Sequence, residues 1–453
     1  MSVFIVLGPM AEVEARPRRM GLRGWRRDTL WQIAERGVRA GLGFVISVAI
    51  ARSLGPDGFG IYSYALATVA LFAFIAQAGL DALLIRELVR APQHAAKLLS
   101  EGLALRLVGA ICAGIASMAA ALLVSSAGMR QATPLVVIFA IAGMLQSGWV
   151  AESWLQANRC FSDTARIKII TYVFTASLRL GALLFASPLI PLATVSLIEV
   201  LIIGVLLWRA SKRRISLGFG ALSLPNPRRA ILLARLASPM LFSAFAIAIY
   251  SRIDIFMLGY MLGGDAVGLY SAGTMLSEGL YLVPAAVMAA VAPRLADLYL
   301  HDRQAFDVGV HSFLRILSLS GLFFAAITTL LAPYAIFLLF GDRYAPAAGV
   351  LQIHVWSTWA VFLSCASDPW YINHDLRRFY LIKTSVAAVL NILLNFVLIP
   401  AWGINGAAWA TTISYITSAL LVGACFTDTR VLFVIQLRAT MGLSHPARIK
   451  ETQ

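Results

Sequence analysis

Four ionisable residues interrupt long apolar stretches of the sequence: Arg179, Arg252, Asp254 and Glu278. If these stretches cross a membrane, each charge is costly and should face water or a partner, which makes it a candidate for function. Arg179 has no acidic neighbour in the sequence. It could therefore bind an anionic head group in a water-filled cavity, or it could be a structural arginine that forms a salt bridge or extends to the membrane surface.

Arg252 and Asp254 lie two positions apart on one expected helix, and Glu278 lies on the next one. Residues two apart point to different helix faces, so Arg252 and Asp254 should not pair with each other. Each then needs water or a partner elsewhere. Asp254 and Glu278 could serve as ion-coupling or gating acids, or they could only form hydrogen bonds between helices.

Two further sets of polar residues recur at helical spacing. One set comprises Gln146, Trp149, Ser153 and Gln156. The other comprises Asn391 and Asn395, with Thr384 preceding them. Such spacing places each set on one helix face, and a polar face in lipid must point toward protein or water. The two sets therefore either contact a substrate or hold helices together.

A short stretch of the chain occurs twice, at residues 53–65 and 261–273. The first copy contains Leu54, Gly55, Asp57, Gly60, Tyr62 and Ser63, and the second contains Leu262, Gly263, Asp265, Gly268, Tyr270 and Ser271. The interval is 208 residues throughout, which predicts two homologous halves. The same interval places Arg86 on Arg294, each at the end of the helix that follows the repeated hairpin.

The composition of the chain indicates that these residues lie in membrane-spanning segments. The 453 residues are 60% hydrophobic and 13% charged, with a mean hydropathy of +0.80, which is more apolar surface than a soluble domain buries. Apolar runs of about 20 residues predict helices, because a helix satisfies its own backbone hydrogen bonds in lipid. We therefore expect an all-α polytopic membrane protein with twelve spans, in two six-helix lobes related by a parallel repeat.

The connections between the expected spans alternate in charge, and the positive-inside rule places both termini in the cytoplasm. The net charge of +15 then reflects topology, so no nucleic-acid partner is expected. The predicted organisation is a basic cytoplasmic N-terminal segment (1–32), an N-terminal lobe (33–210), a basic cytoplasmic linker (211–229), a C-terminal lobe (230–427) and a cytoplasmic tail (428–453).

The segment from Arg16 to Arg39 is basic with interleaved apolar residues. This pattern suits an amphipathic helix that lies on an anionic leaflet, although a plain positive anchor would have the same composition. The residues before it are too few and too uncharged for a signal peptide, and Met10 or Met20 could be the initiator.

The sequence does not show the motifs of several common classes of enzyme. There is no Walker motif, the six histidines are scattered, and the four cysteines have no metal-like or redox-like spacing. No expected loop is long enough to carry the catalytic acids of a membrane glycosyltransferase or polymerase. The sequence pattern favours transport of a substrate and not its chemical conversion. We expect neither a cofactor nor a metal.

Several motifs together resemble a known family. In the first half they are Ala51-Arg52-Ser53-Leu54-Gly55-Pro56, Phe59-Gly60-Ile61-Tyr62 and Leu84-Ile85-Arg86-Glu87. In the second half they are Arg252-Ile253-Asp254, Val267-Gly268-Leu269-Tyr270-Ser271-Ala272, Leu276-Ser277-Glu278 and the Gly-Ile-x-Gly-Ala-Ala turn at 403–408. Their combination resembles the polysaccharide transporter family, the Wzx-type flippases of lipid-linked oligosaccharides, within the multidrug, oligosaccharidyl-lipid and polysaccharide exporter superfamily.

This resemblance implies alternating access between two six-helix lobes in the bacterial inner membrane. The implied substrate is an undecaprenyl-pyrophosphate-linked repeat unit, of the O-antigen or exopolysaccharide type, moved from the cytoplasmic to the outer leaflet. The implied partners are this polyprenyl-pyrophosphate-linked oligosaccharide and membrane lipids, and they could include a polysaccharide polymerase and chain-length machinery.

The site hypothesis assigns one role to each group of residues. Cations attract the pyrophosphate in a low-dielectric cavity, and the candidates are Arg86, Arg179, Arg252 and Arg294. The polar set at 146–156 would contact sugar, and Asn391 and Asn395 would also belong to the substrate-binding residues. A flippase for the peptidoglycan precursor is a chemically close alternative, and an ion-coupled drug exporter of the same superfamily, which would need an acid-rich cavity, is another.

Overall fold

The computed structural model describes residues 22–77, 80–124, 127–185, 188–215 and 224–443. All regular structure in these ranges is helical, and no strand occurs in them. Eight helical stretches are long and apolar enough to cross a membrane, or nine if the bent pair α10 and α11 forms one span. This confirms the expected all-α membrane fold.

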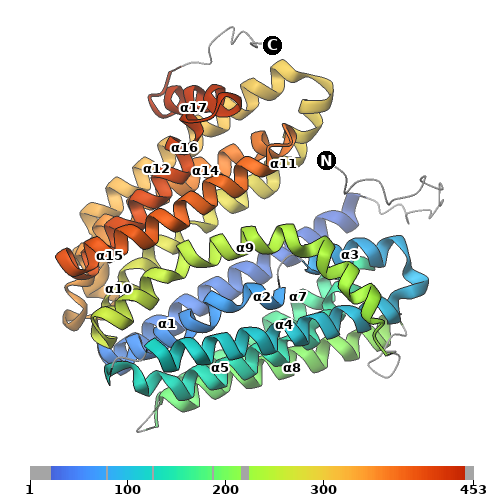
Figure 1. Ribbon diagram of the computed structural model, residues 1–453, viewed down its shortest axis with the longest axis horizontal. Helices are drawn as coiled ribbons and strands as arrows, with labels where there is room; N and C mark the ends of the chain where they lie inside the picture. Colours follow the sequence, from blue (N-terminus) through green and yellow to red (C-terminus); the bar gives the residue numbers. More distant parts are fainter. Residues whose placement is uncertain (1–21, 78–79, 125–126, 186–187, 216–223, 444–453) are drawn as a thin grey trace.

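The N-terminal lobe contains eight α-helices and three short 3₁₀ turns. They are α1 (Leu22–Phe72), α2 (Phe74–Gln77), α3 (Leu80–Arg90), η1 (Pro92–His94), α4 (Ala95–Val124), η2 (Ala127–Ala132), α5 (Thr133–Gln146), η3 (Ser147–Trp149), α6 (Val150–Ala157), α7 (Phe161–Ala182) and α8 (Leu189–Ile215). Figure 1 shows α4, α5 and α8 side by side along one side of the molecule.

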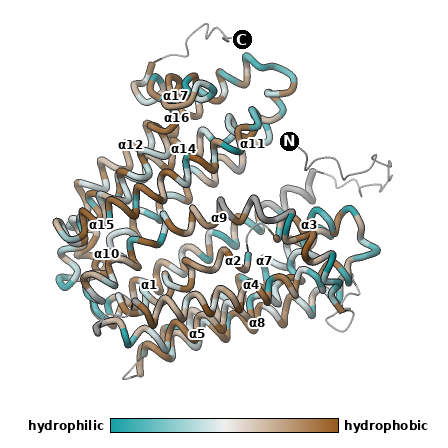
Figure 2. Tube along the Cα trace, viewed as in Figure 1, coloured by the Kyte–Doolittle hydropathy of each residue, from teal (hydrophilic) through white to brown (hydrophobic). Residues whose placement is uncertain are grey.

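The C-terminal lobe begins with α9 and ends with a short helix that follows the last span. Its elements are α9 (Pro227–Met261), α10 (Gly264–Gly279), α11 (Leu282–His301), α12 (Arg303–Phe340), η5 (Asp342–Tyr344), α13 (Ala347–His354), α14 (Trp356–Asn373), α15 (Arg377–Ile416), the π-helical turn η6 (Thr417–Leu421), α16 (Val422–Ala424) and α17 (Thr427–Thr440). Figure 2 shows hydrophobic residues along most of the helix lengths.

Two of the long helices are really pairs of helices joined at a glycine. The backbone leaves the helical region at Gly55 in α1 and at Gly403 in α15, with φ of 70° and 57°. Near the second break, a Cβ atom on Gly406 would overlap the carbonyl oxygen of Leu398, so the chain folds back tightly there. Dividing both helices at these glycines and counting the more polar α7 gives an arrangement compatible with the twelve expected spans.

The two copies of the repeated stretch pack against each other at one end of the molecule. A Cβ atom on Gly60 would overlap the carbonyl oxygen of Gly264, and a Cβ atom on Gly268 would overlap the carbonyl oxygen of Pro56. These contacts exchange equivalent positions of the repeat, as a pseudo-two-fold axis requires. The close approach of two backbones explains why both copies have glycine at this position.

Other contacts between the lobes strengthen the same end. The Tyr344 hydroxyl donates a hydrogen bond to the carbonyl oxygen of Ala51 at 2.8 Å, and Arg52 donates to the carbonyl oxygen of Leu338 at 2.6 Å. Nearby, the ring of Tyr64 stacks on that of Phe256 with centroids 5.8 Å apart. We call this contact region, which joins α1 to α9, α10, α12 and η5, the glycine crossing.

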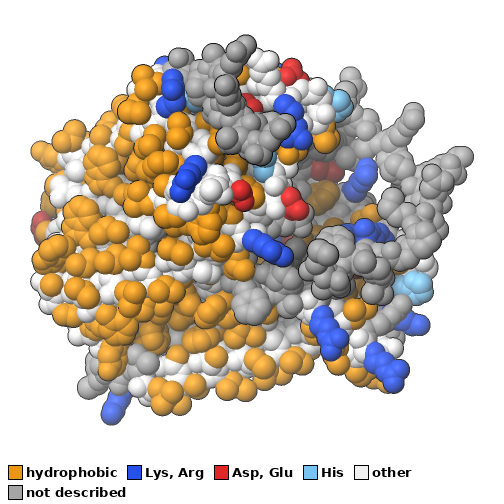
Figure 3. All heavy atoms as spheres, turned by 45° about the horizontal axis from the view of Figure 1, so that its top comes forward, with side chains coloured by type: hydrophobic (Ala, Val, Ile, Leu, Met, Phe, Trp, Pro, Cys, Tyr) orange, Lys and Arg blue, Asp and Glu red, His pale blue; other side chains and the backbone are white. Residues whose placement is uncertain are grey.

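Toward the opposite end, α9 provides the packing between the lobes in the part of the chain that the structure describes. Phe245 of α9 packs on Phe74 at 5.1 Å between ring centroids, and Leu233 joins a small core with Leu83 and Leu105. Figure 1 shows α9 running between the two groups of helices, which diverge toward the end that holds both termini. Figure 3 shows charged side chains gathered around that end and apolar ones over a broad side of the surface.

The two ends of the chain differ in part from the expectations. The first helix runs from Leu22 without a break to Gly55, so the described part of the basic segment extends the first span and is not a separate helix lying on the membrane. The possible initiators Met10 and Met20 lie outside the described residues. The expected tail contains α17, which buries Leu432, Ile435 and Ala439.

Candidate functional site

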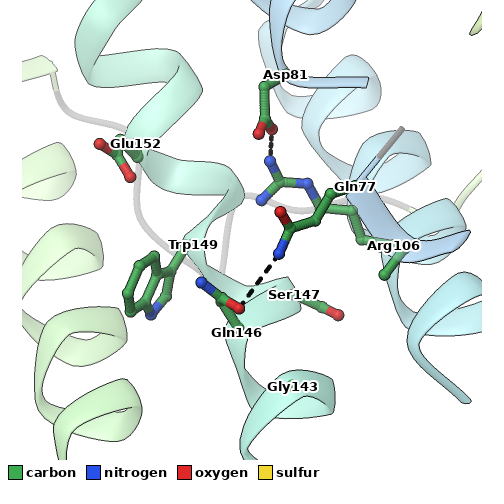
Figure 4. Close-up of a pocket in the computed structure, with 9 residues that line it drawn as sticks. Gln77, Asp81, Arg106, Gly143, Gln146, Ser147, Trp149 and Glu152 are labelled. Atoms are coloured by element: carbon green, nitrogen blue, oxygen red, sulfur yellow. Dashed lines mark hydrogen bonds and ion pairs between the residues drawn. The ribbon is translucent and has the colours of Figure 1, made fainter. Parts of the chain in front are cut away.

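A small polar pocket lies within the N-terminal lobe where two spans are interrupted (Figure 4). It has a volume of about 80 Å³ and is lined by residues from α2, α3, α4, α5, η3 and α6. Arg106 of α4 forms an ion pair with Asp81 of α3. Gln77 donates a hydrogen bond to the side-chain oxygen of Gln146 at 3.4 Å. Helix breaks thus place two amides and an ion pair around one cavity.

The break in the fourth span also separates residues that were expected on one face. Residues 147–149 form a 3₁₀ turn, whose tighter winding rotates the residues after it. Gln146 and Trp149 line the pocket, and the indole nitrogen of Trp149 donates to the carbonyl oxygen of Val200 at 3.1 Å. Ser153 is only 3% exposed, and Gln156 donates to Glu152 at 3.0 Å. Two of the four residues thus line the pocket, while Ser153 is buried and Gln156 is bonded to Glu152.

Glu152, which also lines this pocket, forms an ion pair with Lys168 of α7 at 2.5 Å. The lysine nitrogen lies 5.5 Å from the ring centroid of Trp149, within range of a cation–π interaction. Both charged side chains are less than one-fifth exposed. Lys168 was not among the predicted site residues, although a lysine beside the apolar stretch of α7 was the available signal.

Arg179 has a tight acidic partner that is remote in the sequence. Its guanidinium lies 2.9 Å from a carboxylate oxygen of Glu199 on α8 and donates to the hydroxyl of Ser196 at 3.3 Å. Thr175 donates a second hydrogen bond to Glu199 at 2.7 Å. Both charged side chains are less than one-fifth exposed. This geometry fits the structural-arginine alternative, with Glu199 as the acid that sequence proximity could not reveal.

Arg252 and Glu278 form a different kind of pair in the C-terminal lobe. Their nearest nitrogen and oxygen lie 3.6 Å apart, and the side chains are 38% and 35% exposed. This distance is too long for a hydrogen bond. The pair joins α9 to α10 and retains access to solvent or a ligand, in contrast to Arg179 and Glu199.

Asp254 is directed away from Arg252 into the interior of the lobe, as their spacing predicts. It is 4% exposed and accepts hydrogen bonds from the hydroxyls of Tyr270 and, at 3.3 Å, Thr411. Asn391 donates to Thr411 at 3.2 Å, and Asn395 donates to Asn391 at 3.1 Å. The five side chains come from α9, α10 and α15 and form one buried polar network.

This network changes the environment expected for Asn391 and Asn395. Both are 0% exposed, so neither is available to a sugar in this conformation. The side-chain oxygen of Asn395 is buried and has no hydrogen-bond partner among the described residues. The asparagines thus belong with Asp254 and not with an exposed polar face.

A further charged pair connects α14 to α15. Lys383 is 2% exposed, lies 3.6 Å from Asp368 and donates to the Ser364 hydroxyl at 3.2 Å. Its nitrogen is 4.6 Å from the ring centroids of both Tyr371 and Tyr380. Neither Lys383 nor Asp368 was among the predicted site residues, so this pair was missed.

Arg86 and Arg294 lie outside these buried pairs. Arg86 of α3 is about half exposed and contacts Glu87 at 3.1 Å. Arg294 of α11 is exposed and has no ion pair among the described residues. The four predicted arginines occupy four different helices, and no contact between any two of them is found in the described part of the chain. The structure therefore does not gather them into one cationic cluster.

Comparison with known proteins identifies the family and the fold. The sequence model of the family described as polysaccharide biosynthesis protein matches residues 25–299, more than half of the chain, and the MatE model matches residues 239–397. An uncharacterised membrane protein of Methanocaldococcus jannaschii is 26% identical over 196 residues, which is 42% of this chain and 44% of that protein. The match thus spans less than half the length of this relative.

Two kinds of solved transporter have a similar structure. An inward-facing multidrug resistance MATE family transporter of the MOP superfamily gives a TM-score of 0.70 at 13% identity, over 88% of this chain and 95% of its own. The lipid II flippase MurJ in an inward closed conformation gives 0.67 at 16% identity, over 91% of each chain. These likenesses show a shared fold. The chain belongs to the polysaccharide biosynthesis protein family, and its fold is the one seen in the MATE transporter and in MurJ.

Proposed function

We propose that the protein is a flippase for polyprenyl-pyrophosphate-linked oligosaccharide repeat units, working by alternating access between its two lobes. The family points to polysaccharide biosynthesis, in which sugar repeats are carried on such lipids. In this account the chain moves a repeat unit of the O-antigen or exopolysaccharide type from the cytoplasmic to the outer leaflet of a bacterial inner membrane.

The observation that carries the proposal is the geometry of Arg252 and Glu278. A cation that binds pyrophosphate must be accessible and must not be held by a stronger partner. Arg179 and Lys383 are each mostly buried beside an acid, whereas Arg252 beside Glu278 is 38% exposed. A pyrophosphate offers more charge and more acceptor oxygens than one carboxylate, so it can displace Glu278 from Arg252.

The surroundings of Arg252 suit the sugar part of this substrate. The rings of Tyr250 and Tyr415 lie 5.1 Å apart, and Tyr281 lies 6.2 Å from Tyr415, all partly exposed. Aromatic faces pack on the apolar faces of sugar rings, and phenol hydroxyls exchange hydrogen bonds with sugar hydroxyls. In the N-terminal pocket, the amides of Gln77 and Gln146 offer further contacts of this type.

The buried network around Asp254 is the proposed coupling element. Asp254, Thr411 and Asn395 supply carboxylate, hydroxyl and amide oxygens from two helices, and the Asn395 oxygen has no described partner. Oxygen donors of this type suit a small hard cation or a proton. Binding there would alter the packing of α9 on α15 and so bias the movement of α9 against the N-terminal lobe.

Flipping in proteoliposomes tests the proposal. The full chain is reconstituted with a fluorescent undecaprenyl-pyrophosphate-linked oligosaccharide, and the fraction exposed to an impermeant quencher or glycosidase is followed with time. We expect flipping by the wild type and a rate roughly 10- to 100-fold lower for Arg252→Gln. The same assay with lipid II, and uptake of a cationic dye, distinguish the other members of the superfamily: exclusive activity on either would contradict the proposal.

A further inference from the structure

A basic groove lies between α7 and α8, at the end of the N-terminal lobe that holds the arginine-rich connections. Its volume is about 550 Å³, and its lining includes Arg166, Arg209 and Arg213, with one acid, Asp163. The three arginines are exposed. Arg209 and Arg213 are four residues apart on α8 and therefore share a face, and Arg166 faces them from α7.

The groove combines its cations with an apolar surface. Ile170 of α7 and Leu206 of α8 also line it, and Ile170 is 67% exposed. One wall is held in place, because the Arg166 guanidinium lies 4.8 Å from the ring centroid of Trp31 on α1. Cations above an exposed apolar surface match the arrangement of a phospholipid, whose charged head group lies above its acyl chains.

The C-terminal lobe contains an equivalent groove with a different charge. At an interval of 212 residues, Asp163, Arg166 and Ile170 correspond to Asp375, Arg378 and Ile382, and all six residues line their respective grooves. The second groove has a similar volume of about 530 Å³.

In the second groove, the two positions equivalent to the α8 arginines are uncharged. The positions equivalent to Arg209 and Arg213 hold Leu421 and Cys425, and the lining there includes Asp428 of α17. The N-terminal groove therefore has three arginines against one acid, and the C-terminal groove has one arginine against two acids. The lobes share a shape at this place, and only one of them is suited to an anion.

We propose that the groove of Arg166, Arg209 and Arg213 binds the phosphate head group of an anionic phospholipid from the adjacent leaflet. The groove is separate from Arg252 and Glu278, and α7 and α8 pack on helices of the N-terminal lobe, chiefly α1 and α5. Guanidinium groups bind phosphate oxygens with two hydrogen bonds, and basic pockets between spans at the cytoplasmic side select anionic head groups. The bound lipid anchors this lobe at the membrane surface.

Native mass spectrometry of the delipidated full chain tests this proposal, with phosphatidylglycerol titrated against phosphatidylethanolamine. A basic residue near an anionic surface contributes about fivefold to affinity, so Arg209→Gln with Arg213→Gln should lower the association constant for phosphatidylglycerol roughly 25-fold. Arg378→Gln in the equivalent groove is the matched control and should change it less than twofold. Lysine at positions 209 and 213 should restore most of the affinity.

Three results would overturn the proposal. The first is an unchanged affinity for phosphatidylglycerol in the double variant, and the second is an equal loss in Arg378→Gln. The third is a double variant that loses binding of undecaprenyl pyrophosphate while it keeps that of phosphatidylglycerol, since this would assign the groove to the transported lipid. If the double variant does not fold, each single variant should still lose about fivefold.

Discussion

Each lobe places an arginine beside a glutamate within the membrane, and the two pairs differ in the distance between the charges and in the exposure of the side chains. In the N-terminal lobe, Arg179 and Glu199 are 2.9 Å apart and mostly buried, and hydroxyls from Ser196 and Thr175 complete the pair. In the C-terminal lobe, Arg252 and Glu278 are 3.6 Å apart and more than one-third exposed. The geometry favours an Arg179–Glu199 ion pair that stays intact. It also favours an Arg252 that can exchange Glu278 for another anion.

This difference revises the roles expected of the arginines. An ionised residue within a membrane does not identify a binding site by itself, because a buried acid can satisfy it. Accessibility and the strength of the existing partner decide which cation is free to bind an anion. By these criteria we propose Arg252 as the ligand of pyrophosphate and Arg179 as a structural residue.

The largest expected effect concerns Arg179. Replacing it with alanine leaves Glu199 buried without its cation, which costs about 3–5 kcal/mol for a buried pair. Arg179→Ala should therefore lower the steady-state level and the thermal unfolding temperature of the protein, and the double variant Arg179→Ala with Glu199→Ala should recover much of both. A stable Arg179→Ala protein that fails only in transport would reverse the assignment.

Replacing Arg252 should reduce transport and leave the stability of the protein nearly unchanged. Arg252→Ala removes a charge-assisted contact to the pyrophosphate, worth about 1.5–3 kcal/mol, so transport should fall by roughly 10- to 100-fold. Its partner is partly exposed, so the protein level and unfolding temperature should remain near those of the wild type. Normal flipping by Arg252→Ala would refute the site.

The glycine crossing is the feature that the two lobes share. Gly60→Ala and Gly268→Ala each place a methyl group against a backbone carbonyl of the opposite lobe, which should destabilise the closed form of this end. A bias of about 1.4 kcal/mol depletes a state tenfold, so both variants should reduce transport to a similar extent of about tenfold. Gly181→Ala is the control, because no atom lies within 4 Å of its added Cβ. Spin-label distances across the crossing provide the structural measurement, and unequal effects of the two variants would contradict the symmetry.

The smallest expected effect comes from Glu278→Gln. Removing a partly exposed competitor frees Arg252, and such pairs contribute about 0.2–1 kcal/mol. Affinity for the pyrophosphate lipid should rise by no more than about fivefold. Equilibrium binding in detergent measures this change, and a loss of affinity would show that Glu278 itself contacts the substrate.

The sequence was sufficient for the fold because hydropathy and repetition are local signals. The all-α membrane fold followed from apolar runs, and the 208-residue interval identified two glycines that lie together in the structure. The separation of Arg252 from Asp254 also followed from helix geometry.

The charge partners could not be predicted, since they depend on how distant helices rotate against each other. Glu199 on α8 contacts Arg179 on the neighbouring helix α7, and Asp368 on α14 contacts Lys383 on the neighbouring helix α15. The 3₁₀ turn at 147–149 further divides a polar set that an ideal helix would hold on one face. Single acids and lysines within apolar stretches were visible, but their pairing was not.

The central claim is that Arg252 recognises the pyrophosphate, and one binding measurement tests it most directly. The affinity of undecaprenyl-pyrophosphate-linked oligosaccharide is compared with that of the same lipid lacking phosphate, for the wild type and for Arg252→Gln. We predict that the variant binds the pyrophosphate lipid at least about tenfold more weakly and the phosphate-free lipid equally well. Equal affinity of both proteins for the pyrophosphate lipid would contradict the account.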